Sequence, residues 1–129
     1  MRVFITRWFE RFVRKQKIGD AQLCEAVARA ERGLIDADLG GGLIKQRIAR
    51  AGRGRSGGYR TVIAYRSAER AVFLFGFAKS ERDNIDDDDL ADLKDAAALF
   101  LNFDDAALQA AVEAEKLKEV RCDEQEVPE

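Results

Sequence analysis

The stretch from residue 40 to residue 60, GGGLIKQRIARAGRGRSGGYR, holds the residues best suited to bind phosphate. It contains seven of the chain's ten glycines and six cations, with no Asp or Glu among them. The planar guanidinium of Arg binds two phosphate oxygens at once, and Lys adds a compact point charge. A loop that needed only solubility would mix both signs of charge. We therefore predict that this stretch binds a phosphate backbone through Lys45, Arg47, Arg50, Arg53, Arg55 and Arg60.

The same stretch contains GRGRSG, which matches the pattern G-x-G-x-x-G of dinucleotide-binding loops. That pattern binds a pyrophosphate when it follows a strand and opens a helix. The residues that follow here, YRTVIAY, are β-branched and aromatic and predict a strand instead. We therefore interpret the glycines as a flexible connection between two strands.

The composition indicates one globular domain with an uneven charge distribution. The chain has 129 residues, and 47% of them are hydrophobic. Residues 1–82 carry 18 Lys or Arg against 8 Asp or Glu, whereas residues 83–129 carry 4 against 16. A basic body suits an anionic partner such as RNA or DNA. The alternative is that the charge blocks are only solvated faces.

Several residue types narrow the chemistry and the location. The chain has no His, which removes the commonest general acid–base group and the commonest zinc ligand. Its two cysteines, Cys24 and Cys122, lie far apart and without partner motifs, and we expect them to be reduced thiols. Charged residues interrupt the apolar N-terminal residues, so neither a signal peptide nor a membrane span is predicted. We expect a cytoplasmic protein.

Hydrophobic spacing predicts a helical hairpin near the N-terminus, after a short strand over residues 2–6. The first helix begins after Thr6 as N-cap and stops by Gly19. The second begins at Asp20 as N-cap and is ended by Gly33. The aromatic side chains in these helices and in the later strands are expected to be mostly core. Stacking on RNA bases would require an exposure that the sequence does not reveal.

Three strands are predicted next, over residues 43–48, 59–66 and 70–77. Alternation along the first of them places Lys45 and Arg47 on one face of the sheet. The third is apolar throughout and should be central. Three neighbouring strands after a helical hairpin predict an α+β fold, with the hairpin packed on an antiparallel sheet.

The acidic C-terminal part predicts two more helices and an edge strand. Four acids, Asp86–Asp89, precede an apolar-periodic run, and their spacing does not match a calcium-binding loop. We interpret them as the N-cap and first-turn charges of a third helix. Asp104 is a candidate cap of a short fourth helix, and residues 117–122 predict an edge strand.

The order of these elements, the motif GLIDADLGGGLIKQRIARAGRGRSGGYRTVIAYR and the later FLFGFAKSERDNI resemble the RelE/HigB superfamily of bacterial toxins from type II toxin–antitoxin systems. The resemblance covers residues 1–101, which we expect to form the toxin domain, and residues 102–129 would extend it. It implies a compact fold like that of microbial ribonucleases. The implied activity is mRNA cleavage on the ribosome, in which the 2′-hydroxyl attacks the adjacent phosphate.

The resemblance also implies partners and a chemistry without auxiliary groups. No metal or cofactor is expected. The partners would be mRNA, usually on the ribosome, and a cognate antitoxin encoded beside the toxin, expected to be a helix-turn-helix protein. Contact with operator DNA would run through that antitoxin, and no membrane partner is implied.

Residue by residue, the resemblance carries five positions of the family's site onto this chain. The basic strand corresponds to Lys45 and Arg47, the GYR arginine to Arg60, and the segment after the last core strand to Lys79 and Arg82. The family's tyrosine a few residues further on has no counterpart here, and the arginine after that lysine is Ser80.

Elementary chemistry assigns roles to these cations. Arg keeps its proton in proteins, so Arg47 and Arg60 would hold the phosphate and stabilise its added charge. Lys45 is the candidate base, provided that its cationic neighbours favour its neutral form, and Lys79 is the candidate acid. Arg50, Arg53 and Arg55 would grip RNA from the loop.

Two alternatives stay open from the sequence. One is a relative that binds RNA, the ribosome or an antitoxin through the same face without catalysis, which the missing His and Tyr favour. The other is a gyrase poison of the related ParE type, which would not need the full set of cations.

Overall fold

The structure is a computed structural model that describes residues 1–50, 54–80 and 84–122, with only the backbone of residues 54–57. The described residues form four helices and six strands. They are β1 (Arg2–Thr6), α1 (Arg7–Gln16), α2 (Asp20–Glu31), β2 (Ala37–Gly40), β3 (Leu43–Arg50), β4 (Gly54–Arg66), β5 (Arg70–Ala78), α3 (Asp87–Leu101), α4 (Asp105–Glu113) and β6 (Leu117–Val120). None of the helices in the described ranges is long and apolar enough to cross a bilayer.

All six strands form one sheet in the order β2-β3-β4-β5-β1-β6. Strands β2 to β5 follow one another in antiparallel pairs, which confirms the predicted meander and the interior position of β5. The sheet is mostly antiparallel as predicted, and it becomes mixed because β1 pairs in parallel with β5. In the sequence, β1 and β5 are far apart and both N-terminal helices lie between them. No tight turn therefore joins these two strands and forces them to be antiparallel.

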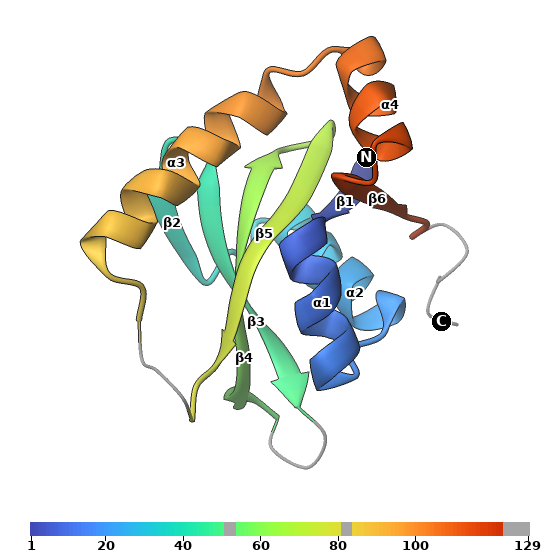
Figure 1. The fold of residues 1–129 in the computed structure, drawn as a ribbon. Coiled ribbons are helices and arrows are strands. Elements are labelled where there is room, and N and C mark those ends of the chain that lie inside the picture. The colour runs from blue at the N-terminus through green and yellow to red at the C-terminus, as the bar shows by residue number, and fades with distance from the viewer. Residues whose placement is uncertain (51–53, 81–83, 123–129) are drawn as a thin grey trace.

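The sheet separates two layers of helices (Figure 1). The hairpin of α1 and α2 covers one face and shares a core with residues such as Ile5, Phe9 and Ile63. On the other face α3 and α4 share a second core with Leu43 and Val62. The N-terminal helices therefore pack on the sheet as predicted, and the face of α3 carries the candidate site.

Local signals explain most of the helix ends. The Thr6 hydroxyl accepts a hydrogen bond from the Phe9 amide at 3.2 Å, which confirms the predicted N-cap of α1. Asp86 caps α3 in the same way, and Asp104 caps α4. The predicted cap at Asp20 is wrong, because Asp20 is the first residue inside α2 and its N-cap is Gly19. The carboxylate of Asp20 still lies in the first turn, where its negative charge interacts favourably with the positive end of the helix dipole.

The short strand β2 was not predicted, because its sequence ADLG carries almost no strand signal. The turn that joins it to β3 runs through Gly40, Gly41 and Gly42, all with positive φ. At Gly42 a Cβ atom would also lie 2.7 Å from Leu101, so glycine allows α3 to approach the turn closely.

Cys24 in α2 and Cys122 after β6 form a disulfide, with their Cα atoms 5.4 Å apart. The expectation of two reduced thiols is therefore wrong in this structure. Both cysteines pack against the core under the α1–α2 hairpin. The bond ties the end of β6 to α2, on the face of the sheet opposite α3.

Candidate nucleic-acid interface

A row of side chains crosses the sheet on the face of α3. Arg47 of β3 lies directly opposite Arg60 of β4, and Arg60 lies opposite Phe77 of β5. Directly paired residues in antiparallel strands share a face, so both arginines project from the same side of the sheet. Lys45 is two residues before Arg47 and shares this side. We call Lys45, Arg47 and Arg60 the cationic row.

The opposite side of these strands is fully occupied. Ile44, Gln46 and Ile48 alternate with the cations and are buried under the α1–α2 hairpin. Tyr59 is 4% exposed and belongs to the same core, which confirms that it faces away from Arg60. The cations are thus on one face because the other face is needed for packing.

Helix α3 covers only part of the face that carries the cationic row. Its residues Ala97 and Leu101 pack with Leu43, Val62 and Ala64 at one end of β3 and β4. The other end of these strands, where Arg50 pairs with Gly54, extends beyond α3 (Figure 1). Arg47, whose side chain is 46% exposed, lies between these two ends. This arrangement leaves the Arg47 guanidinium accessible to a ligand.

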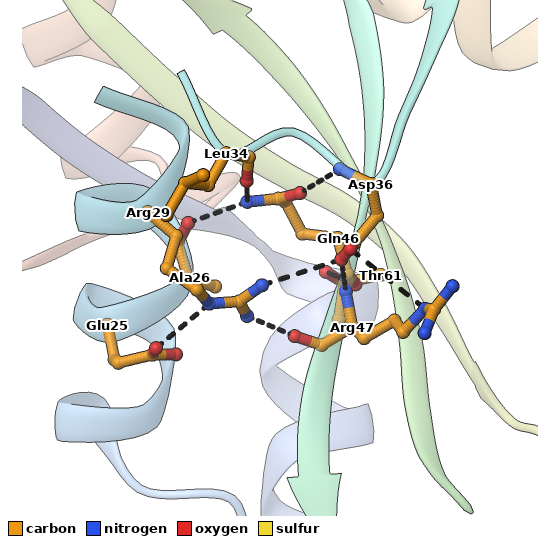
Figure 2. A network of polar contacts seen from close by, with 8 residues as sticks. All are labelled: Glu25, Ala26, Arg29, Leu34, Asp36, Gln46, Arg47 and Thr61. Atoms are coloured by element: carbon orange, nitrogen blue, oxygen red, sulfur yellow. Dashed lines mark hydrogen bonds and ion pairs between the residues drawn. The ribbon is translucent and has the colours of Figure 1, made fainter. Parts of the chain in front are cut away.

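The backbone of β3 at Arg47 is fixed by two side chains from outside the strand. The Asp36 carboxylate accepts a hydrogen bond from the Arg47 amide at 2.7 Å. The buried guanidinium of Arg29 donates to the Arg47 carbonyl, to Glu25 at 2.8 Å and to Asp36 at 3.4 Å. Figure 2 shows that this network links α2, the segment before β2 and β3. The network holds the strand mainly through the Arg47 backbone, and the Arg47 guanidinium joins it only through a 4.0 Å ion pair with Asp36.

Gln46 anchors the same strand from its buried face. Its side chain is fully buried and donates to the carbonyls of Ala26 and Leu34 at 2.9 and 3.2 Å. It also accepts from the Asp36 amide at 2.8 Å (Figure 2). A buried amide in a strand is stable only when its polar atoms are paired, so these bonds specify the position of β3.

Sequence reasoning missed Arg29, Asp36 and Gln46 as supporting residues. The sequence did contain one sign of this support: Gln46 is a polar residue between two isoleucines on the apolar side of a predicted strand. A polar residue at such a position indicates a buried hydrogen-bonding partner. Its partners lie in a loop and a helix, which the strand pattern does not identify.

Among the described residues, Asp36 is the acid beside Arg47. Its carboxylate lies 4.0 Å from the Arg47 guanidinium, and Asp36 also pairs with Arg29. A carboxylate shared between two arginines leaves Arg47 able to bind an added anion. Within the described ranges, no group of three or more His, Cys, Asp and Glu is placed to hold a metal ion.

The other predicted site residues are distributed differently. The Lys79 amide donates to the Gly58 carbonyl at 3.1 Å, so pairing with β4 continues to Lys79, which is exposed. Arg50 lies over the ring of Tyr59 at 5.7 Å, on the side of the α1–α2 hairpin, and the sheet separates it from the cationic row. Arg53 and Arg82 lie outside the described residues, and Arg55 lies in β4 where only the backbone is described.

Neither tyrosine of the chain is placed beside the cationic row. Tyr59 is buried under the hairpin, where its hydroxyl group lies 3.2 Å from the Gln16 side chain. Tyr65 packs against the same core and its hydroxyl donates to Glu31. The burial of Tyr65 raises the pKa of its hydroxyl, and the hydrogen bond to Glu31 adds to this effect. The side chains of β3 and β5 that face the same way as Arg60 include Lys45, Arg47 and Phe77.

Comparison with known proteins identifies the family of the chain. No curated protein matches the sequence closely. One protein family does match, over residues 1–120, and it is described as the RelE toxin of the RelE/RelB toxin–antitoxin system. This match spans every helix and strand of the structure. The chain with the cationic row therefore belongs to the RelE toxin family, whose members act together with a RelB-type antitoxin.

Proposed function

We propose that this toxin is an endoribonuclease that cleaves mRNA on the ribosome without a metal ion. The observation that carries the proposal is the direct pairing of Arg47 with Arg60, with Lys45 on the same face. Paired strands are about 5 Å apart, so two guanidinium groups projecting from one pair can bind different oxygens of one phosphate. Such a site suits a phosphodiester better than a flat protein contact.

The proposed reaction is attack of the substrate's own 2′-hydroxyl on the adjacent phosphorus. A base removes the 2′-hydroxyl proton, the P–O bond to the 5′-oxygen breaks, and an acid protonates that oxygen. The products are a 2′,3′-cyclic phosphate and a free 5′-hydroxyl. Arg47 and Arg60 would stabilise the extra negative charge that develops on the phosphate.

Lys45 is the candidate base because it lies on the same face as both arginines and is half-buried. Lys79 is the candidate acid at the end of β5, and Arg82 would support it. Arg53 and Arg55 would hold RNA beyond the site, and Arg50 would do so from the opposite face.

One observation supports a second candidate function, a non-catalytic RNA or ribosome binder. The chain has no His, and both of its tyrosines lie on the side of the α1–α2 hairpin. A site made only of Lys and Arg can bind phosphate strongly even if proton transfer is slow.

Controlled expression in bacteria would separate these candidates. We expect the wild type to arrest growth and to cut mRNA within codons on ribosomes. Lys45→Ala and Arg60→Ala should reduce cleavage by at least about 100-fold, in line with the loss of one acid–base or charge-stabilising group. Lys118→Ala is the matched control, because Lys118 lies on β6 with its side chain 65% exposed.

The outcomes differ for each candidate. Arrest and cleavage that survive both substitutions would sink the proposed site. Arrest without mRNA cleavage in the wild type would favour the non-catalytic binder. We also expect the antitoxin to be a small helix-turn-helix protein from the neighbouring reading frame, and its co-expression should restore growth.

A further inference from the structure

An aromatic hollow lies at the edge of β5, beside the cationic row. Strand β1 pairs with β5 only as far as Phe73, so the remainder of β5 is flanked by α1 instead of a strand. The hollow between α1 and this part of β5 has a volume of about 370 Å³. This is within the usual size of small-ligand sites. Its main lining residues are Trp8, Arg11, Phe12, Lys15, Phe75 and Phe77.

The rings in this hollow leave one large aromatic side chain exposed. Trp8 is 41% exposed, although its ring packs 4.7 Å from Phe75 and 5.8 Å from Phe12. Gly76 makes this packing possible, because a Cβ atom there would lie 2.6 Å from the Phe12 ring. A tryptophan that is supported by other rings and still exposed is a rigid surface for stacking.

The charges around the hollow favour a polyanion. Arg11 and Lys15 lie one turn apart on α1, and none of the described residues lining the hollow is acidic. A larger hollow of about 750 Å³ lies between α1 and β6, but Glu10, Glu115 and Glu119 line it together with its cations. Rings combined with cations are the usual features of sites for single-stranded nucleic acid.

The hollow lies next to the cationic row. Arg47, Arg60 and Phe77 are paired across three strands, and Phe77 also lines the hollow. One strand spacing, about 5 Å, separates the backbones of Arg60 and Phe77. A neighbouring nucleotide of an extended strand can cover this distance.

We propose that the aromatic hollow is a base-stacking subsite for single-stranded RNA. Trp8 stacks on a base, and Arg11 and Lys15 bind the phosphate next to it. This inference rests on the proposed function, because the same RNA strand places another phosphate over Arg47 and Arg60.

Trp8 is the only tryptophan of the chain, so its intrinsic fluorescence reports directly on the subsite. Purified full-length protein would be titrated at low salt with a short single-stranded RNA, and separately with inorganic polyphosphate. Fluorescence anisotropy of labelled RNA would measure total binding in parallel. We expect saturable quenching of Trp8 by RNA and none by polyphosphate.

Substitutions sharpen the test. Trp8→Ala should weaken RNA binding roughly five- to hundred-fold, the range measured for removal of one stacking platform. Trp8→Phe should restore most of the affinity, because phenylalanine still offers a ring. Thermal melting of both variants shows whether they fold. Lys15→Ala should lower both the affinity and its dependence on salt.

Four results would overturn the subsite. They are RNA binding without quenching of Trp8, equal quenching by polyphosphate, unchanged affinity in folded Trp8→Ala, and the absence of RNA binding at low salt. A change of Trp8 fluorescence that only the antitoxin produces would assign the hollow to a protein partner instead. The ribosome assay is independent of these results. If mRNA cleavage depends on Arg60 but RNA does not change the fluorescence of Trp8, the subsite is contradicted and the nuclease is not. If RNA quenches Trp8 but no mRNA is cleaved, the nuclease is contradicted and the subsite is not.

Discussion

At the scale of single residues, the position of the cationic row depends on side chains that never face the substrate. Gln46 and Arg29 are both buried, and both bind the segment that carries or precedes Arg47. Cations on a flexible strand would repel one another and separate. A strand held by buried hydrogen bonds keeps them on one face and close together, which favours binding of one phosphate.

We expect Gln46→Leu to destabilise the protein by about 2–4 kcal/mol. Leucine has a similar size but leaves the buried Ala26 carbonyl, and the part-buried Leu34 carbonyl and Asp36 amide, without their partner. Chemical denaturation of wild type and variant measures this difference. Gln109→Leu is the control, because Gln109 is exposed on α4 and should change stability by less than about 0.5 kcal/mol. Equal effects of the two substitutions would contradict the anchoring role of Gln46.

The side of the sheet on which Lys45, Arg47 and Arg60 lie could be predicted from the sequence, because alternation in a strand is a local property. The direct pairing of Arg47 with Arg60 could not, since alternation within each strand does not give the register between two strands. The predicted strand ended at residue 48, so Arg50 was assigned to the loop. In the structure β3 continues to Arg50, and alternation places Arg50 on the other face, over the Tyr59 ring.

At the scale of elements, contacts between segment ends determine how the layers are joined. Arg66 and Arg70, from β4 and β5, donate to the Leu101 and Phe100 carbonyls at the end of α3. The last turn of α3 has no basic residue of its own, so the sheet supplies the cations that oppose its dipole. These bonds hold the end of α3 against β4 and β5. They thereby help to determine which part of the sheet face α3 covers and which part, with Arg47, stays accessible.

The end of α2 is joined to the β4–β5 turn through Glu31. Its carboxylate accepts hydrogen bonds from the Tyr65 hydroxyl, from Ser67 at 3.2 Å and from the Ala68 amide at 3.1 Å. The bond from Tyr65 is the main reason that the pKa of Glu31 is lower than usual. A carboxyl group with a lowered folded-state pKa stabilises the protein above its ordinary pKa and loses this effect as the pH falls further.

We therefore expect Glu31→Gln to flatten the acid side of the stability profile. As the pH falls below about 4.5, the wild type should lose the stability that ionised Glu31 contributes. This loss should be about 1 kcal/mol or less, because solvent screens the exposed carboxylate. Thermal melting between about pH 3 and pH 7 measures the effect. Glu69→Gln is the control at the same turn, since the Glu69 side chain is 62% exposed. Parallel profiles for wild type and Glu31→Gln would contradict the role assigned to Glu31.

Elements with strong local signals could be predicted, and those that depend on distant contacts could not. The strand β1 and the caps of α1, α3 and α4 follow from short sequence patterns. The strand β2 forms because β3 offers it an edge, and glycines allow the turn between them. The parallel pairing of β1 with β5 depends on how the α1–α2 hairpin packs.

At the scale of the whole molecule, positive and negative residues occupy different parts of the same face of the sheet. The four consecutive acids of residues 86–89 cap and open α3, which covers one part of the face that carries the cationic row. In the proposed complex, an RNA strand would be attracted to the open part of this face and repelled from the helix beside it. This charge distribution would direct the strand from the cationic row toward β5 and the aromatic hollow, which the net charge of −2 does not reveal.

The disulfide is the long-range link that sequence reasoning interpreted wrongly, because cysteines 98 positions apart give no local signal. Closing a loop of this length restricts the unfolded chain and stabilises the fold by up to about 4–5 kcal/mol. We expect a reductant to lower the melting temperature of the wild type, and the double variant Cys24→Ser with Cys122→Ser to melt at that lower temperature with or without reductant. Because the bond lies on the face opposite the cationic row, RNA affinity measured well below melting should stay within about twofold. An unchanged melting temperature on reduction would show that the bond contributes no stability, and a large loss of RNA affinity would show that the two faces are coupled.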